Sequence, residues 1–144
     1  EDKLGYKRFI FFYLLCGIIA TFVQYLADIE TAIPLIGASG AIAGVLGAYI
    51  YLFPRAKVTV IIPMLFFFFT MRLPSFVVLG FWFVIQFINA SISSSDSNIA
   101  WLAHIGGFIA GLLYVMLFFK EKNNIRGKSK LISKTIIKKS PWEN

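Results

Sequence analysis

The chain has 144 residues, of which 58% are hydrophobic and 16 are phenylalanine, and its mean hydropathy is +0.77. This composition is far too apolar for an ordinary soluble domain, and it predicts an integral membrane protein. The formal net charge is +7. We attribute that charge to membrane topology and to attraction for anionic lipid rather than to a nucleic-acid partner.

Four apolar blocks of about 17–21 residues run along the chain, and none contains Lys or Arg. They are 9–27, 35–53, 74–90 and 99–119. Blocks of this length match the hydrocarbon core of a bilayer, so we predict an all-α polytopic bundle with four transmembrane helices. A fifth apolar run, 58–70, has only 13 residues and contains a proline. We predict that it forms an interfacial or re-entrant segment.

The basic residues indicate which side each end occupies. If the amino terminus is cytoplasmic and 58–70 does not cross, all 14 Lys and Arg lie inside, and loops 28–34 and 91–98 carry only acidic charges. The positive-inside rule favours this arrangement. We therefore expect a multi-pass protein of the cell membrane with both ends cytoplasmic. Residues 1–119 would form the transmembrane core and 120–144 a basic cytoplasmic tail.

A hydroxyl near the start of the second block and the only histidine in the chain are the chemically notable side chains. Ser39 lies in "GASG", and His104 lies in the last block. Small residues and a serine often serve helix packing alone, and a packing histidine is the corresponding structural alternative. A histidine inside a span is costly, however, and by default faces the protein interior or a wet cavity. Both residues are expected about 6–8 Å below the outer surface.

Glycines follow both residues at helical spacing. Gly107 and Gly111 lie three and seven positions after His104, and Gly40 and Gly44 follow Ser39. Helices with such stripes can pack almost backbone to backbone. This packing would bring the serine hydroxyl within the roughly 2.6–3.2 Å of the imidazole that general-base activation requires.

The expected chemistry is that of a Ser-His dyad, with Ser39 as nucleophile and His104 as general base. The unpaired amides where the second helix begins, flanked by Gly37, suit a developing oxyanion. Acidic residues occur only outside the blocks, so we predict a dyad rather than a triad. The lone histidine and the lone Cys16 predict no metal site, and we expect no cofactor.

Two motifs carry a resemblance to a known family. "GASG" at 37–40 and "AHIGGFIAG" at 103–111 resemble the G-x-S-G and A-H-x-x-G-x-x-x-G pair of rhomboid intramembrane serine proteases. The similarity extends over most of residues 1–119. It implies the later part of a six-helix core that hydrolyses a peptide bond in or next to a transmembrane helix of its substrate. It also implies that the 74–90 span acts as a lateral gate.

The chain departs from the family pattern in two ways. The family's H-x-x-x-N motif, which helps to hold the oxyanion, is absent because the chain has one histidine. Since the chain begins with Glu1, we expect the first two helices to lie upstream in a longer protein, and little catalysis from this chain alone. Ala43 replaces an aromatic residue that stacks on the histidine in some members.

Two other functions are compatible with a membrane protein of this size. A non-catalytic rhomboid-like protein would bind transmembrane clients without cutting them, but such relatives typically lose the serine or the histidine. A channel or half-transporter would need polar residues along several spans. Gln24, Gln86 and Asn89 are too few to favour that second alternative.

Overall fold

The structure is a computed structural model of the chain. It describes residues 1–27, 29, 37–64, 67–92 and 99–118. The predicted tail 120–144 and most of the two predicted outer loops lie outside the described residues.

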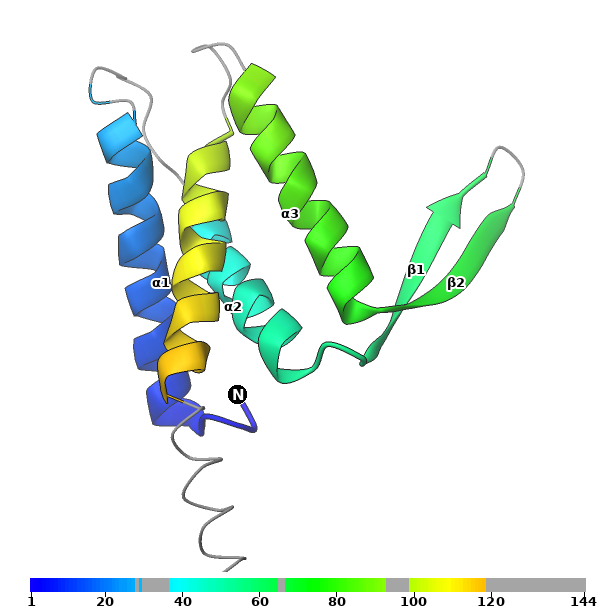
Figure 1. Cartoon of the computed structure of the whole chain (residues 1–144), viewed down its shortest axis with the longest axis horizontal. Helices are drawn as coiled ribbons and strands as arrows, with labels where there is room; N and C mark the ends of the chain where they lie inside the picture. The colour runs from blue at the N-terminus through cyan, green and yellow to red at the C-terminus, as the bar shows by residue number, and fades with distance from the viewer. Residues whose placement is uncertain (28, 30–36, 65–66, 93–98, 119–144) are drawn as a thin grey trace, which may run out of the picture.

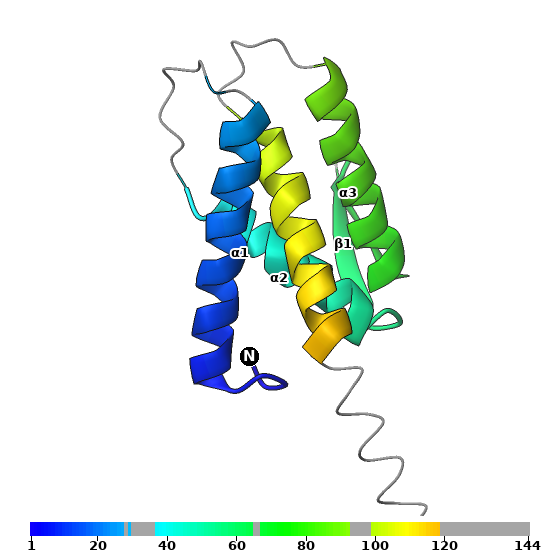
Figure 2. The same ribbon diagram turned by 60° about the vertical axis from the view of Figure 1, so that its left-hand side comes forward.

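The described residues are mostly helical. Three labelled helices are α1 (Tyr6–Ala27), α2 (Ser39–Leu52) and α3 (Ser75–Ile92). A further helix, Trp101–Phe118, is called here the His104 helix. Figures 1 and 2 show α1, α2 and the His104 helix gathered together, with α3 alongside. The ends of these helices fall within about three residues of the ends of the predicted blocks, except that α2 starts four residues later than its block.

The lengths of the helices bear on the number of membrane spans. Within the described residues, α1, α3 and the His104 helix are long and apolar enough to cross a membrane. Helix α2 has 14 residues, or about 21 Å, against a hydrocarbon core of about 30 Å. It also begins deeper in the bundle than α1 and α3 end (Figure 2). Three spans are therefore supported, and the fourth stays a prediction.

The segment between α2 and α3 differs from the all-helical prediction. Strands β1 (Lys57–Pro63) and β2 (Phe68–Pro74) form an antiparallel hairpin in which Val60 lies opposite Met71. It projects away from the helices beside α3 (Figure 1). The all-α fold class does not hold for this segment, because β-branched residues dominate β1 and favour extended backbone, while proline disfavours a helix interior. The predicted interfacial position of 58–70 stays a prediction.

A small core joins α1, α2 and the His104 helix. Its buried members are Phe12, Cys16, Ala48 and Val115. All the buried residues of α2 are glycine or alanine. Because these side chains occupy little volume, the neighbouring helices can approach α2 closely.

Glycine stripes mark the contact between α2 and the His104 helix. A Cβ atom added to Gly107 would overlap the carbonyl oxygen of Gly40, and one added to Gly111 would overlap that of Gly44. On the α1 side, a Cβ at Gly44 would lie 2.5 Å from the Cβ of Cys16. Helix α2 therefore meets the His104 helix backbone to backbone.

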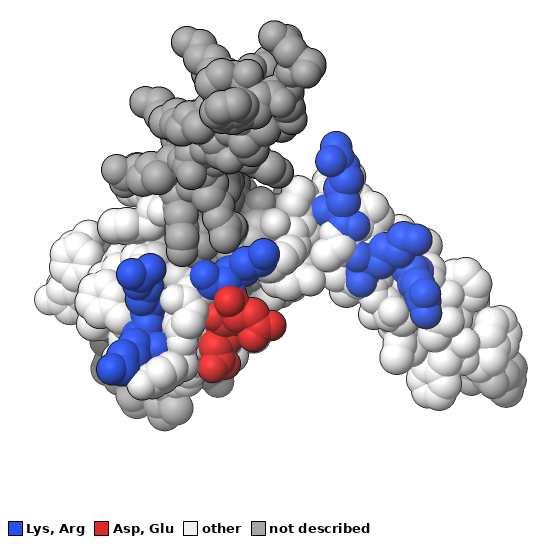
Figure 3. Space-filling model, turned by 90° about the horizontal axis from the view of Figure 1, so that it is seen from below, with Lys and Arg blue, Asp and Glu red and all other residues white. Residues whose placement is uncertain are grey.

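The described basic side chains gather at one end of the molecule. Figure 3 shows this end, which is the lower one in Figure 1. They flank the start of α1 and the base of the hairpin: Lys3, Lys7, Arg8, Arg55, Lys57 and Arg72. The later half of α1, away from that end, contacts the start of α2, since a Cβ on Gly40 would lie 2.5 Å from the Cβ of Ala20.

Candidate active site

The structure brings Ser39 and His104 into hydrogen-bond contact. The Nε2 atom of His104 lies 2.9 Å from the Oγ atom of Ser39, although the two residues are 65 positions apart in sequence. Ser39 is the first residue of α2, and His104 lies in the first turn of the His104 helix. Their neighbours Gly40 and Ala103 are buried against each other, because a Cβ on Gly40 would lie 3.4 Å from the Ala103 carbonyl oxygen. The close helix contact thus extends up to the pair.

The pair is open on one side. The serine is exposed and the histidine half-buried, whereas Gly40 and Ala103 beside them are buried. A reacting group can therefore reach the hydroxyl from the open side. On the other side, the contact between α2 and the His104 helix fixes the positions of the two residues.

Amides without a partner inside the helix lie next to the serine where α2 begins. Ala38 is the N-cap, and no side chain caps the helix among the described residues. The first intrahelical bond runs from the amide of Ile42 to the carbonyl of Ala38. The amides of Ser39, Gly40 and Ala41 therefore have no partner within the helix, and they carry the positive end of its dipole.

Gly37 has a different role from the other predicted glycines. Its backbone φ angle of +123° is one that residues with a side chain rarely adopt, and a Cβ there would meet nothing within 4 Å. Gly37 therefore shapes the turn into α2 and takes no part in the contact between helices.

Gln86 is a member of the site that the sequence analysis missed. Its Oε1 atom lies 2.8 Å from the Nδ1 atom of His104, and its Nε2 atom lies 3.2 Å from the carbonyl oxygen of Trp82 on the same helix. Gln86 is only 4% exposed although it belongs to α3, a helix with few buried residues. A polar side chain inside an apolar span was the available signal, because such groups usually face the protein interior.

Two indole rings also contact the histidine. The ring centres of Trp82 and Trp101 lie 6.0 and 6.1 Å from that of His104, and Trp101 meets it edge-on. Ala43, which replaces the stacking aromatic of some family members, is fully buried. Aromatic contact with the imidazole therefore comes from α3 and from the histidine's own helix.

A second glutamine fixes the start of the His104 helix. The Oε1 atom of Gln24 on α1 accepts a hydrogen bond of 3.1 Å from the amide of Ala103. That amide lies in the first turn, where a helix supplies no partner of its own. Gln24 therefore links α1 to the turn that carries His104.

Replacing Gln24 by leucine is expected to lower the free energy of unfolding by about 1–3 kcal/mol, because the buried Ala103 amide loses its acceptor. Thermal denaturation in detergent micelles measures the change. Gln24→Glu is the matched control, since it keeps an acceptor oxygen at nearly the same place. Equal melting temperatures for Gln24→Leu and the unsubstituted protein would show that this bond does not stabilise the fold.

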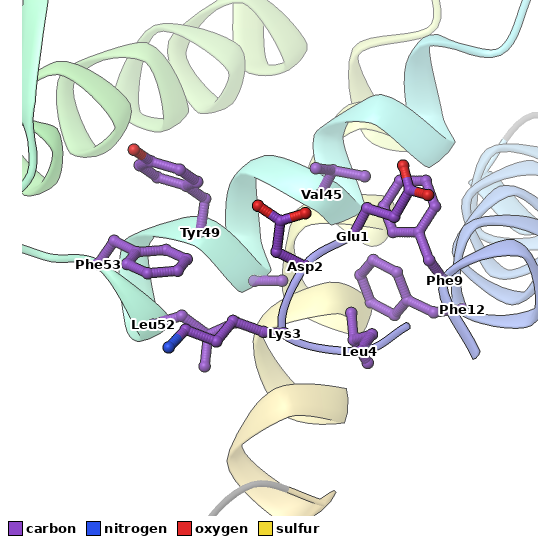
Figure 4. A pocket seen from close by; sticks show the side chains of 11 residues that line it. Glu1, Asp2, Lys3, Leu4, Phe9, Phe12, Val45, Tyr49, Leu52 and Phe53 are labelled. Carbon is purple, nitrogen blue, oxygen red and sulfur yellow. The ribbon is translucent and has the colours of Figure 1, made fainter. Parts of the chain in front are cut away.

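The described residues offer no metal centre, and one cavity among them lies away from the pair. They contain no group of three or more His, Cys, Asp and Glu side chains that could hold a metal ion. A cavity of about 260 Å³ lies between the amino-terminal residues, α1 and the later part of α2, where Phe9, Phe12 and Tyr49 line it (Figure 4). Neither Ser39 nor His104 lines this cavity, so it is separate from the pair.

Comparisons with known proteins identify the family of the chain. The Rhomboid domain family matches residues 1–121. The chain is 33% identical over 89 residues to "Rhomboid protein 1, mitochondrial" of Saccharomyces cerevisiae. That match covers 62% of this chain and 23% of the relative, so the chain spans about a quarter of the relative's length. No solved structure matches the chain. With three membrane-capable helices and a family match over most of its length, the chain is a multi-pass integral membrane protein and belongs to the rhomboid family.

Proposed function

We propose that the chain supplies the Ser-His dyad of an intramembrane serine endopeptidase. The substrate would be a transmembrane protein, cut at a peptide bond in or next to its membrane-spanning helix. The observation that carries the proposal is the 2.9 Å distance between His104 Nε2 and Ser39 Oγ. The rhomboid family generally comprises serine proteases, which supports this reading.

The proposed reaction uses the two side chains in sequence. The hydroxyl oxygen of Ser39 attacks the substrate carbonyl carbon while its proton moves to His104 Nε2. The tetrahedral oxyanion accepts hydrogen bonds from the amides of Ser39 and Gly40, which have no partner inside α2. The intermediate then collapses, the carbon–nitrogen bond breaks and His104 returns the proton to the leaving amine. In the second half, His104 takes a proton from water as the water oxygen attacks the acyl ester; the bond to Ser39 Oγ then breaks, and His104 returns the proton to that oxygen.

The substrate must expose its backbone before attack. Carbonyl groups inside a helix are hydrogen-bonded, so the helix must unwind locally at the cleavage site. Glycine and proline lower the cost of unwinding because both weaken helices. We therefore propose that substrates carry helix-weakening residues near the cut, and that no cofactor takes part.

We further propose that the protein lies in the cell membrane with both chain ends cytoplasmic. The gathering of described basic residues at one end, which the positive-inside rule assigns to the cytoplasm, supports this orientation (Figure 3). The hairpin would lie at the same interface, since Arg55 and Lys57 adjoin its base while Phe67 and Phe68 near its tip are exposed. The tail 120–144 would extend into the cytoplasm.

Labelling with a serine-reactive fluorophosphonate tests the proposed dyad. We expect the membrane-embedded protein to be labelled, and labelling to be lost in Ser39→Ala. Ser91→Ala is the matched control, since Ser91 is an exposed helical serine whose hydroxyl donates to its own helix at Phe87. Where the gene encodes a longer protein, that protein is compared with the chain, because the H-x-x-x-N motif is absent from this sequence.

The result that contradicts the dyad is equally specific. If the folded full protein takes no label, or if Ser39→Ala is labelled as strongly as the unsubstituted protein, Ser39 is not an activated nucleophile. The non-catalytic, client-binding alternative would then account for the family membership.

A further inference from the structure

The hydrogen bonds around Gln86 determine which nitrogen of His104 carries the proton. A backbone carbonyl only accepts, so the Gln86 atom that faces the Trp82 carbonyl must be the amide nitrogen. The amide oxygen then faces His104 Nδ1, and because an amide oxygen only accepts, Nδ1 must be protonated. In a neutral imidazole, Nε2 is then unprotonated and is the acceptor that faces the Ser39 hydroxyl.

We infer that Gln86 is a positioning residue that holds His104 in the tautomer able to accept the proton of Ser39. The inference rests on the proposed function, and it extends the dyad to a relay of Trp82 carbonyl, Gln86, His104 and Ser39. An amide performs here the orienting task that a carboxylate performs in a Ser-His-Asp triad. It does so without placing a charge inside the membrane, where a carboxylate would be costly.

Because Gln86 belongs to α3, the orientation of the His104 imidazole depends on how α3 packs against the other helices. The buried residues of α3 are Ser75, Leu79 and Gln86. Ser75 fixes one end through a hydrogen bond to the carbonyl of Phe53. Near the site, ring contacts of Trp82 and Phe83 with Phe108 accompany the Gln86 bond. With so few buried residues, displacement of α3 at this level breaks the bond to Nδ1 and frees the imidazole to change tautomer.

The single histidine allows a direct test. Nitrogen NMR of this ¹⁵N-histidine-labelled chain in lipid nanodiscs, at a pH where the imidazole is neutral, reports which ring nitrogen of His104 carries the proton. We expect the Nδ1–H tautomer in the unsubstituted protein and a shift toward Nε2–H in Gln86→Leu. Gln86→Glu keeps an acceptor and is expected to restore Nδ1–H. Asn89→Leu is the matched control on the same helix, and its spectrum should not change.

Labelling rates link the tautomer to function. Gln86→Leu is expected to slow fluorophosphonate labelling about 10- to 100-fold, and Gln86→Glu to recover most of the rate, because a wrong tautomer presents a proton to the serine instead of a lone pair. An unchanged tautomer and rate in Gln86→Leu would overturn the inference while leaving the dyad intact. If the unsubstituted protein takes no label, the proposed function fails, and the NMR spectrum still decides whether Gln86 selects the tautomer.

Discussion

Gly107→Ala and Gly111→Ala are each expected to lower the free energy of unfolding by about 1–3 kcal/mol, the usual cost of overpacking. The added methyl groups would overlap backbone carbonyls of Gly40 and Gly44, which cannot move aside as the end of a flexible side chain can. The helices must therefore separate. Because Gly107 lies one turn from His104, the separation also draws the imidazole away from Ser39, and fluorophosphonate labelling should slow.

Gly80→Ala is the matched control for these substitutions. Gly80 is also a helical glycine, on α3, but a Cβ there meets nothing within 4 Å. The same chemical change should therefore leave stability equal or slightly higher, since alanine is the better helix former. Thermal denaturation in detergent micelles compares the three variants. If Gly107→Ala has the same melting temperature as Gly80→Ala, the backbone contact between α2 and the His104 helix does not stabilise the fold.

His104→Ala is expected to slow labelling of Ser39 by about 100- to 10,000-fold, the range typical of a general base. A serine hydroxyl is a weak nucleophile until a base takes its proton, and the described residues place no other base on the Ser39 hydroxyl. The measurement is the pseudo-first-order rate of labelling, with Ser39→Ala as the zero baseline. Added imidazole is expected to restore part of the rate, because it can occupy the half-buried space that the side chain leaves.

The histidine prediction has a clear contrary outcome. Labelling of His104→Ala at the rate of the unsubstituted protein would mean that the 2.9 Å contact with Ser39 serves packing and not proton transfer. The described fold would be unaffected by this result, and His104 would be a packing histidine rather than a general base.

The helical part of the fold could be predicted because the bilayer restricts what a long apolar segment can do. Blocks 9–27, 74–90 and 99–119 each coincide, to within about three residues at either end, with a helix long enough to span, since a backbone in lipid must satisfy its own hydrogen bonds. The hairpin was missed because length, hydropathy and a proline tell whether a segment can span a membrane and do not report strand pairing. The run of β-branched residues beside Pro63 was the signal for a strand.

The site could be predicted only where local spacing carries information. Glycines three and seven residues after His104 define one face of one helix, so the close helix contact could be anticipated. Gln86 is 18 residues from His104 on another helix. A polar residue in a span indicates that its face of α3 turns inward, but a single sequence does not tell which group of another helix it contacts. The same holds for the ring contact between Trp82 and His104.

Cleavage of a transmembrane reporter in liposomes tests the central claim most directly. The full protein is reconstituted with a single-span substrate that carries glycine and proline in its helix, and the products are identified by mass spectrometry. The account predicts a cut in or next to the spanning helix with the unsubstituted protein and with Ser91→Ala, and none with Ser39→Ala. Binding of the reporter without any cleavage, or cleavage that persists in Ser39→Ala, would contradict it.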